Sequence, residues 1–490
     1  MVGEPPGGSF RDVGKHMQKH AAGSDKGDNP YLTPQGEAGA VVTPSVDVPL
    51  VGNNPRYERW RWQVFFITWL AYGGFYLTRK SFAVAKVSLS KGSSAWSLAD
   101  MTLVDTAYLA AYAVGQFVWG VSGDKFGTRK VILLGMMASI ITAAVMGAVS
   151  GVWIMAALLC LQGLCQSAGW APLAKNVGEF FSQRERGRVM GLWCTNYAFG
   201  GFVASALAGA AADQWGWRFA FWVPAGVLLI VWLLFYFLQV NKPEDVGLPP
   251  IEEYHGEPRA VIEPGDLPAD EPEGSWRVVA EVCSSGMVWL LGAVYFLLKP
   301  TRYLVLLWSP LYVNQRLGTG AATSGILGSM FDLAGPISVL LGGYLSDKVF
   351  RTKRMPLSVI SLIAVAVLMF FFNRLPDTRL GLGLGFFAVG FLLYIPDSLV
   401  SGTAAIDFGT KRGASTAAGI INGCGSIGAV AGNLLPWWME RTLGKGVYIW
   451  NHVFIALAIS LLLAGLLLLP QWNALPAAAA ANNARKDKKS

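Results

Sequence analysis

Long apolar segments recur along almost the whole chain, and they constrain its fold more than any other feature. Each is close to the roughly 20 residues that an α-helix needs to cross a bilayer. Twelve such segments are expected to form helices: 62–87, 98–122, 130–150, 153–178, 188–212, 217–240, 284–314, 322–346, 355–373, 380–402, 413–438 and 447–470. Only 14% of the residues are charged, against roughly 25% in a soluble domain. We therefore predict an all-α integral membrane protein with twelve transmembrane helices.

A polar stretch separates the first six segments from the last six. It covers 241–282 and is rich in proline and acidic side chains, so it is unsuited to span a membrane. We predict two six-helix halves, 56–240 and 283–472, joined by this stretch as a cytoplasmic linker. Residues 1–55 are predicted to form a disordered tail, and 473–490 a second, basic tail. Because no apolar signal segment precedes the first helix, that helix is expected to act as the insertion signal.

Lysine and arginine residues are concentrated in the loops on one side of the predicted helices. Both tails belong to that side, together with the basic residues around Arg129 and Arg354. Loops with an excess of basic residues face the cytoplasm. We therefore predict a multi-pass protein of the cytoplasmic (inner) membrane with both termini in the cytoplasm. The net charge of +8 then reflects topology, and no aromatic–basic cluster in a soluble domain indicates a nucleic-acid partner.

The sequence carries no recognisable motif for catalysis or metal binding. The five cysteines lie within or beside apolar segments without C-x-x-C spacing, and the four histidines lack metal-ligand spacing. A nucleophile elbow, a Walker loop and a clustered carboxylate pair are also missing from the sequence. We expect no enzyme activity, no cofactor and no metal site.

The two halves resemble each other in sequence. The second predicted helix is followed by GVSGDKFGTRK (120–130), and the eighth by GYLSDKVFRTKR (343–354). Asp124 in the first loop corresponds to Asp347 in the second, 223 residues later. Such a repeat implies two halves related by a pseudo-two-fold axis, with a substrate site between them near the bilayer midplane.

The same offset relates two polar stripes, one in the first predicted helix and one in the seventh. Each stripe has the spacing i, i+4, i+7, which places its members on one helix face. The stripes consist of Tyr72, Tyr76 and Arg79, and of Tyr295, Lys299 and Arg302. Two faces related by the repeat are expected to converge on one central cavity.

Four cations within apolar helices need an explanation: Arg79, Lys80, Lys299 and Arg302. One cation at the centre of a lipid-exposed helix costs about 2.5–3.5 kcal/mol, and four would cost roughly 10 kcal/mol. Three intramembrane acids could offset part of this: Asp105, Asp332 and Asp397. Because the cations outnumber the acids, we expect an anionic ligand.

Phosphate is the anion that two arginines suit best. Guanidinium groups pair with phosphate oxygens through two hydrogen bonds and stay charged at any relevant pH. Arg79 and Arg302, one from each half, are therefore predicted to hold a phosphate. Lys80 lies about 100° around the helix from Arg79 and could instead point between helices. Lys299 is followed by Pro300, which bends the local backbone, and could instead be held in a structural salt bridge.

Several stretches carry a family resemblance. The loops with Asp124 and Asp347 resemble the signature of the major facilitator superfamily. Further stretches resemble its organophosphate:phosphate antiporter family, which includes glycerol-3-phosphate and hexose-phosphate carriers and sugar-phosphate exchangers. They are YGGFYLTRKSFAVA (72–85), GLCQSAGWAPLAKNVGEFFSQRERG (163–187), DVGLPPIEEY (245–254), RYLVLLWSPLY (302–312), GGYLSDKVFR (342–351) and STAAGIINGCGSIGA (415–429).

The resemblance implies roles for particular residues. Arg79 and Arg302 match the paired arginines that hold the phosphate in that family. Gln116 and Tyr197 stand where the glycerol-3-phosphate carriers have a lysine and a histidine, so they are candidate ligand contacts that argue against glycerol-3-phosphate itself. The implied gating residues of the repeated loops are Asp124, Arg129, Asp347 and Lys348.

The resemblance also implies the activity: exchange of an organophosphate, in particular a sugar phosphate, for inorganic phosphate by alternating access. Glycine-rich helices five and eleven would allow the close helix packing that this motion requires. Two alternatives stay open. One is a membrane sensor of sugar phosphate that signals to a partner kinase; the other is a proton-coupled transporter of another solute, with Asp105, Asp332 or Asp397 as the proton site. The expected partners are the two phosphate ligands and the lipid bilayer, and the protein is expected to function as a monomer.

Overall fold

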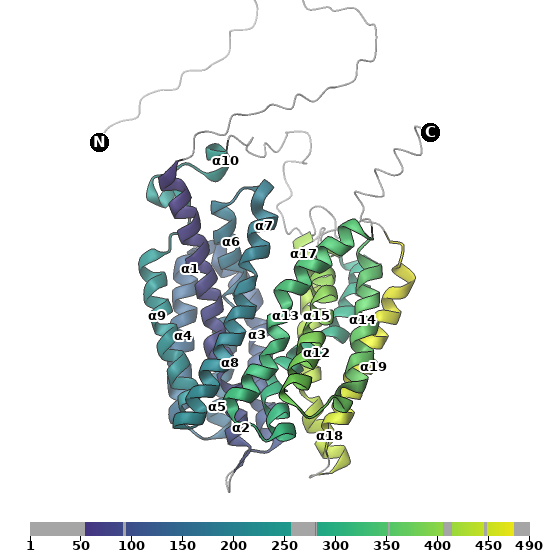
Figure 1. Cartoon of the computed structure of the whole chain (residues 1–490). Helices are drawn as coiled ribbons and strands as arrows, with labels where there is room; N and C mark the ends of the chain where they lie inside the picture. The colour runs from purple at the N-terminus through teal and green to yellow at the C-terminus, as the bar shows by residue number, and fades with distance from the viewer. Residues whose placement is uncertain are drawn as a thin grey trace, which may run out of the picture. The chain divides into compact units, whose positions relative to one another are not determined.

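The computed structural model describes residues 54–91, 95–255, 280, 282–350, 353–404, 414–444 and 448–474. Every described residue belongs to one compact unit, 49–490. Within the described residues all regular elements are helices (Figure 1). The all-α prediction is therefore confirmed. The predicted tails lie outside the described residues, apart from residues 54, 55, 473 and 474.

The N-terminal half contains the six spans that the sequence predicts, three of them broken into two helices. They are α1 (Pro55–Arg79) with α2 (Ser81–Leu89), α3 (Leu98–Phe126), α4 (Thr128–Ala148), α5 (Val152–Gln166) with α6 (Trp170–Phe180), α7 (Gln183–Trp193) with α8 (Thr195–Trp215), and α9 (Phe219–Leu238). The break after α1 is slight, because the N–H of Lys80 still donates to the carbonyl of Tyr76. Arg79 and Lys80 thus lie at a break within one span.

The C-terminal half repeats this arrangement. Its spans are α12 (Gly286–Leu317), α13 (Ala321–Lys348), α14 (Arg354–Phe371) with η2 (Phe372–Arg374), α15 (Arg379–Ser398) with η3 (Leu399–Ala404), α17 (Ala414–Asn433) with α18 (Leu435–Leu443), and α19 (Trp450–Leu468) with η4 (Leu469–Gln471). Prolines lie inside α12, at Pro300 and Pro310. A proline lacks the N–H that would bond the carbonyl four residues earlier. Pro310 therefore leaves the carbonyl of Leu306 without its usual helical donor.

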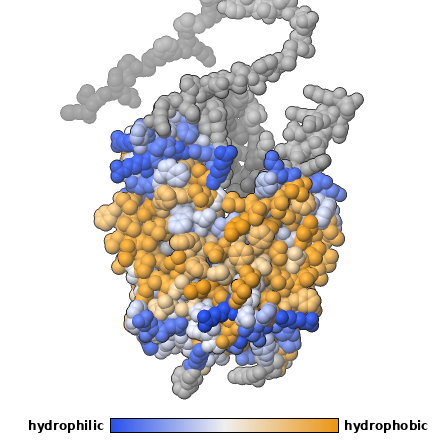
Figure 2. Space-filling view, in the orientation of Figure 1, coloured by the Kyte–Doolittle hydropathy of each residue, from blue (hydrophilic) through white to orange (hydrophobic). Residues whose placement is uncertain are grey.

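The surface of the bundle is apolar where a bilayer would contact it. Phe66 is 61% exposed, Trp153 76% and Phe237 73%. Figure 2 shows a broad band of hydrophobic residues between two polar ends. Nine of the described helical segments are long and apolar enough to cross a membrane by length and composition alone. A continuous band of exposed aromatic and aliphatic side chains is typical of a surface that contacts a membrane.

The first part of the predicted linker is helical and packs on the start of α1. It forms η1 (Pro243–Val246) and α10 (Ile251–Tyr254). The rings of Tyr57 and Tyr254 stack with their centroids 3.9 Å apart, and the hydroxyl of Tyr57 donates to the carbonyl of Pro249 over 3.0 Å. The rest of the predicted linker lies outside the described residues, apart from Ala280 and Val282. Residues 243–255 are thus an ordered part of the N-terminal half.

Glycines allow helices to approach closely at several points. A Cβ atom on Gly200 of α8 would lie 2.6 Å from the carbonyl oxygen of Gly73 in α1. A Cβ atom on Gly428 of α17 would lie 2.1 Å from the carbonyl oxygen of Phe296 in α12. Gly423 in the same helix has open space around it, with nothing within 4 Å of such an atom. Close packing therefore requires some of the glycines in α8 and α17, the fifth and eleventh spans, but not all of them.

The two halves meet mainly through three pairs of helices: α8 with α13, α3 with α17, and α2 with α12. Three sets of hydrogen bonds that involve no lysine or arginine cross between the halves within the described residues. Asp213 accepts from the N–H groups of Ala321 and Ala322 over 2.7 and 2.9 Å. Ser329 donates to Ser205 over 2.6 Å, and Asn433 donates to Thr106 over 3.0 Å.

These contacts lie toward one side of the bundle. Figure 1 shows the first turn of α1 at one end of the helices and α2 and α18 at the opposite end, which we name the far side. Asp213 is close to the last residue of α8, and Ala321 is the first residue of α13. Because α8 runs toward the far side and α13 starts there, the halves are held together on the far side.

Candidate functional site

Arg79 is a buried cation with no carboxylate beside it among the described residues. It is the last residue of α1 and is 9% exposed. Its guanidinium lies over the rings of Tyr76 and Tyr112, with centroid distances of 4.5 and 5.1 Å. Its Nε donates to the side-chain oxygen of Gln166 over 3.1 Å, whereas its buried Nη2 makes no hydrogen bond within the described part of the chain. A buried cation with an unused donor is a suitable group to bind an anion.

Gln166 is a site residue that the sequence reasoning missed. It is the last residue of α5 and is fully buried. Its oxygen accepts from Arg79 and, over 3.0 Å, from the hydroxyl of Tyr108, while its Nε2 donates to Thr78 over 2.9 Å. A glutamine inside an apolar helix was the available signal. The contact with Arg79 fixes the direction of the guanidinium without adding charge.

Arg302 has a different environment, although it is the repeat equivalent of Arg79. Its Nη1 lies 2.5 Å from Oδ2 of Asp397 at the end of α15, and its guanidinium lies 4.9 Å from the ring centre of Tyr394. The other oxygen of Asp397 accepts from the hydroxyl of Tyr295 over 3.1 Å. The side chain of Arg302 is 21% exposed, so the paired guanidinium can still be reached.

Lys299 is the second buried cation without a carboxylate within the described residues. It is 8% exposed on α12, one turn before Arg302. Its ammonium lies 4.6 Å from the ring centre of Tyr295 and 5.3 Å from that of Tyr303. Aromatic faces attract a cation but leave its net charge in place. Tyr303, absent from the predicted site, belongs to this group by its contact with Lys299.

Lys80 points between the two halves. Its ammonium forms an ion pair with Asp332 of α13 over 2.8 Å and lies 3.4 Å from the carbonyl oxygen of Leu306, which Pro310 leaves free. Lys80 is 2% exposed and Asp332 is 1% exposed. Of the two orientations that the sequence leaves open for Lys80, the structure has the one between helices.

Lys86 is a further cation inside the first span, a fully buried residue of α2. It forms an ion pair with Asp105 of α3, and it donates to the carbonyl of Leu307 over 3.0 Å. Its ammonium also lies 3.8 Å from the ring centre of Trp308. Each of the three predicted intramembrane acids therefore has its own cation, and the sequence could not show this because the partners come from distant helices.

The remaining predicted contacts surround these cations to different extents. Tyr72 is buried and packs edge-on against Tyr76, with ring centres 5.9 Å apart. Tyr197 stacks across the two halves on Tyr394 at 6.1 Å. Gln116 lies one helical turn beyond Tyr112 on the same face of α3 and is exposed. Tyr72 and Tyr197 thus bring rings and hydroxyls near Arg79 and Arg302, respectively, whereas Gln116 makes no contact with either arginine in the described part of the chain.

The predicted gating residues lie at the ends of helices opposite the far side. Asp124 and Asp347 are in the last turns of α3 and α13, at corresponding places in the two halves, but their side chains lie outside the described part of the structure. Arg129 donates through Nη2 to the carbonyl of Tyr236 over 2.5 Å, and its N–H donates to Asn241 over 2.9 Å. Lys348 is exposed at the end of α13.

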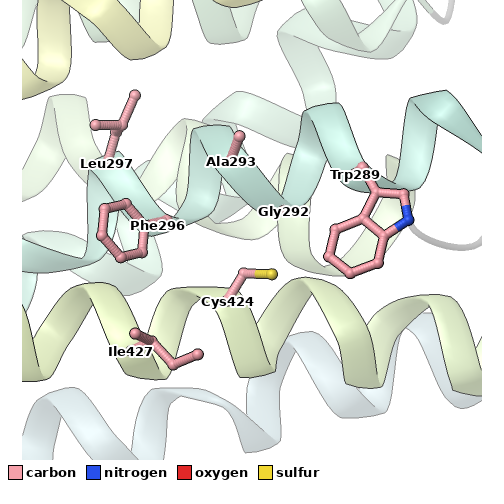
Figure 3. A pocket seen from close by; sticks show the side chains of 7 residues that line it. All are labelled: Trp289, Gly292, Ala293, Phe296, Leu297, Cys424 and Ile427. Atoms are coloured by element: carbon pink, nitrogen blue, oxygen red, sulfur yellow. The ribbon is translucent and has the colours of Figure 1, made fainter. Parts of the chain in front are cut away.

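A separate pocket lies between α12 and α17 and has a volume of about 430 Å³ (Figure 3). Seven residues line it: Trp289, Gly292, Ala293, Phe296, Leu297, Cys424 and Ile427. It contains none of the predicted ligand residues and offers no charged group. An anion would therefore bind at the central cations and not in this pocket.

Comparison with known proteins agrees with this arrangement. The family model described as Major Facilitator Superfamily matches residues 64–433. The fold is also similar to a solved structure of a bacterial homologue of the human lysosomal transporter Spinster, with a TM-score of 0.64 and 15% identity over 86% of this chain and 96% of that one.

Three curated relatives are similar along most of their length. A probable hexose phosphate transport protein of Chlamydia pneumoniae is 29% identical over 86% of this chain and 92% of its own. The membrane sensor protein UhpC of Escherichia coli is 27% identical over 87% and 97%. The glucose-6-phosphate exchanger SLC37A2 of Bos taurus is 29% identical over 83% and 92%.

The twelve-helix architecture, the family match over most of the chain and these relatives agree with the resemblance that the sequence motifs carry. The chain belongs to the major facilitator superfamily, within it to the organophosphate:phosphate antiporter family, and is a multi-pass membrane protein of a transporter family and not an enzyme.

Proposed function

We propose that this protein exchanges an organophosphate, in particular a sugar phosphate, for inorganic phosphate by alternating access. The observation that carries the proposal is the buried guanidinium of Arg79, which has a free donor and no carboxylate beside it within the described residues. A dianionic phosphate supplies the missing charge and accepts the unused hydrogen bonds. The hexose phosphate and glucose-6-phosphate relatives support a sugar phosphate as the organic ligand.

The phosphate would bind between Arg79 of the N-terminal half and Arg302 of the C-terminal half. Tyr76 supports this arrangement, because its ring lies 4.5 Å from the guanidinium of Arg79 and its hydroxyl is within electrostatic range of Arg302 as well. Lys299, also from the C-terminal half, is the third cation of the site. The rings and hydroxyls of the tyrosines around it can contact the sugar. A ligand that contacts both halves stabilises the closed arrangement more than either open one, which is the requirement for transport by rocking.

The contacts between the halves would have to break when the site opens to the far side. These are the hydrogen bonds of Asp213, Ser205 and Asn433 and the contacts of Lys80 and Lys86 with α12 and α13. With both termini in the cytoplasm of an inner-membrane protein, as the loop charges predict, the far side is the outer side. The present structure is then closed to the outside.

Counterflow in vesicles tests the proposal. The full chain is reconstituted in vesicles loaded with inorganic phosphate, and uptake of labelled phosphate and labelled hexose phosphate is measured. We expect uptake that requires internal phosphate and that disappears in Arg79→Gln. Binding without flux would favour a sensor, which the similarity to UhpC makes the second candidate. Flux that needs a proton gradient and no internal phosphate would contradict exchange.

A further inference from the structure

We propose that Asp397 determines which phosphate ligands the site accepts, by holding Arg302 and setting the charge of the site to match one dianionic phosphate group. The inference rests on the proposed function and adds to it the charge class of the ligand. It follows from the way in which the buried charges of the described residues are paired.

Both carboxylate oxygens of Asp397 contact residues of the site. Oδ2 pairs with Nη1 of Arg302 at 2.5 Å, and Oδ1 accepts from the hydroxyl of Tyr295 over 3.1 Å. The backbone carbonyl of Asp397 accepts from Ser401 in η3 over 2.6 Å, which anchors this end of α15. The side chain is 8% exposed. A carboxylate with two such donors is held in a fixed direction.

The equivalent arginine of the other half has no such carboxylate. Arg79 donates to the uncharged oxygen of Gln166, on the fourth span of its half, whereas Arg302 pairs with Asp397, on the fourth span of the other half. The two halves therefore have equivalent arginines but different acceptors for them: an amide oxygen in the N-terminal half and a carboxylate in the C-terminal half. Only one of the two arginines brings net charge to the site.

The buried charges then add up to a defined value. The pairs of the described residues are Lys80 with Asp332, Lys86 with Asp105, and Arg302 with Asp397. Arg79 and Lys299 are the two buried central cations left without a carboxylate among the residues described. The site thus offers two uncompensated positive charges, and it would offer three if Asp397 were uncharged.

A single phosphate monoester matches two charges. It carries about −1.5 to −2 at pH 7, so the loaded site is close to neutral. A bisphosphate would leave excess negative charge in a buried place, which is unfavourable at low dielectric. Asp397 therefore excludes more highly charged ligands.

Arg302 still takes part in binding. It uses Nη1 for Asp397, while its Nε and Nη2 make no hydrogen bond to any described residue, and its side chain is 21% exposed. The Nε–Nη2 edge of a guanidinium can form two parallel hydrogen bonds to a phosphate. Asp397 thus lowers the net charge around Arg302 and leaves its second edge for the ligand.

Calorimetric titration of the full chain in detergent tests this inference, with inorganic phosphate, a hexose 6-phosphate and a hexose 1,6-bisphosphate as probes. In Asp397→Asn, which keeps the shape and an acceptor for Arg302, we expect the affinity for the bisphosphate relative to the monophosphate to rise at least about tenfold. Asp397→Glu keeps the charge and should keep the wild-type order of ligands.

A second pair of variants distinguishes an effect of charge from a purely structural effect of the substitutions. Lys299→Met lowers the site to one uncompensated charge and should weaken monophosphate binding at least about tenfold. Lys299→Met combined with Asp397→Asn restores two charges and should recover most of that loss. A structural role alone predicts that the double variant binds worse than either single one, and that result would overturn the proposal.

Two further results are distinguishable. If the wild-type chain binds inorganic phosphate and the hexose 6-phosphate, but Asp397→Asn leaves the bisphosphate preference unchanged, the role of Asp397 is refuted while the proposed function stands. If the wild-type chain binds none of the three probes, the proposed function and the role of Asp397 both fail.

Discussion

Gln166 holds Arg79 through an uncharged oxygen, with Nε of the guanidinium 3.1 Å from Oε1 of the amide. The same oxygen accepts from Tyr108, and the amide nitrogen donates to Thr78, so both ends of the amide are fixed. The arginine is oriented by this contact, but its charge is not compensated. An orienting residue without charge leaves the full attraction of Arg79 for a ligand.

Replacing Gln166 by glutamate should therefore weaken phosphate binding. The substitution is nearly isosteric and puts a carboxylate at Nε of Arg79, which reproduces the pairing of Arg302 with Asp397. We expect phosphate affinity to fall at least about tenfold, because one of the two uncompensated charges is lost. Gln166→Met removes the hydrogen bonds without adding charge and should have a smaller effect. Equal affinities of Gln166→Glu and the wild-type chain, measured by calorimetry, would show that Arg79 does not bind the phosphate.

Arg79→Lys should abolish exchange although it keeps the positive charge. An ammonium has no planar fork for two phosphate oxygens, and it cannot reach Gln166 with the same geometry. We expect the initial rate of labelled phosphate uptake into phosphate-loaded vesicles to fall at least about 100-fold, by analogy with the loss of charge-assisted bidentate contacts. Arg218→Lys is a matched control, since Arg218 is exposed beside Trp217, at the start of α9. Retention of half the wild-type rate by Arg79→Lys would speak against a guanidinium-specific site.

The ion pair of Lys80 and Asp332 should show strong coupling in a double-mutant cycle. Removing one partner leaves a buried charge alone and is expected to lower stability by about 3–5 kcal/mol. Lys80→Met and Asp332→Asn together should lower stability by less than the sum of the two single changes. Unfolding in detergent, followed by intrinsic fluorescence, gives the three differences. Additive effects would mean that the 2.8 Å pair contributes little to holding the halves together.

Two glycines of α17 should respond oppositely to the same substitution. In Gly428→Ala the new Cβ would lie 2.1 Å from the carbonyl oxygen of Phe296, so α12 and α17 must separate. We expect a loss of about 1–3 kcal/mol from this overpacking. Gly423→Ala meets no atom within 4 Å and should be neutral or stabilise by up to about 1 kcal/mol, because alanine favours the helix. Thermal unfolding of both variants in the same detergent decides between these outcomes, and a stable Gly428→Ala protein would contradict the observed packing.

Some features of the site could be predicted from the sequence because they depend on local order along the chain. The spacing of Tyr72, Tyr76 and Arg79 places these residues on one helix face whatever the rest of the fold does. The repeat then identifies Arg302 as the counterpart of Arg79. The polar interruption after α9 separates the halves for an equally local reason, since a charged, proline-rich stretch cannot cross a bilayer.

The helix count and the two halves were determined by the sequence by itself, since the length of each apolar segment must match the bilayer. The pairing of the charges was decided only by the tertiary structure. Gln166 and Arg79 are 87 residues apart, and Asp397 and Arg302 are 95 apart. Which acid meets which cation depends on how separate helices pack, and no periodicity along one helix contains that information. The sequence therefore determined that a surplus of positive charge lies in the membrane, and the packing of α5, α13 and α15 decided that Arg79 and Lys299 carry it.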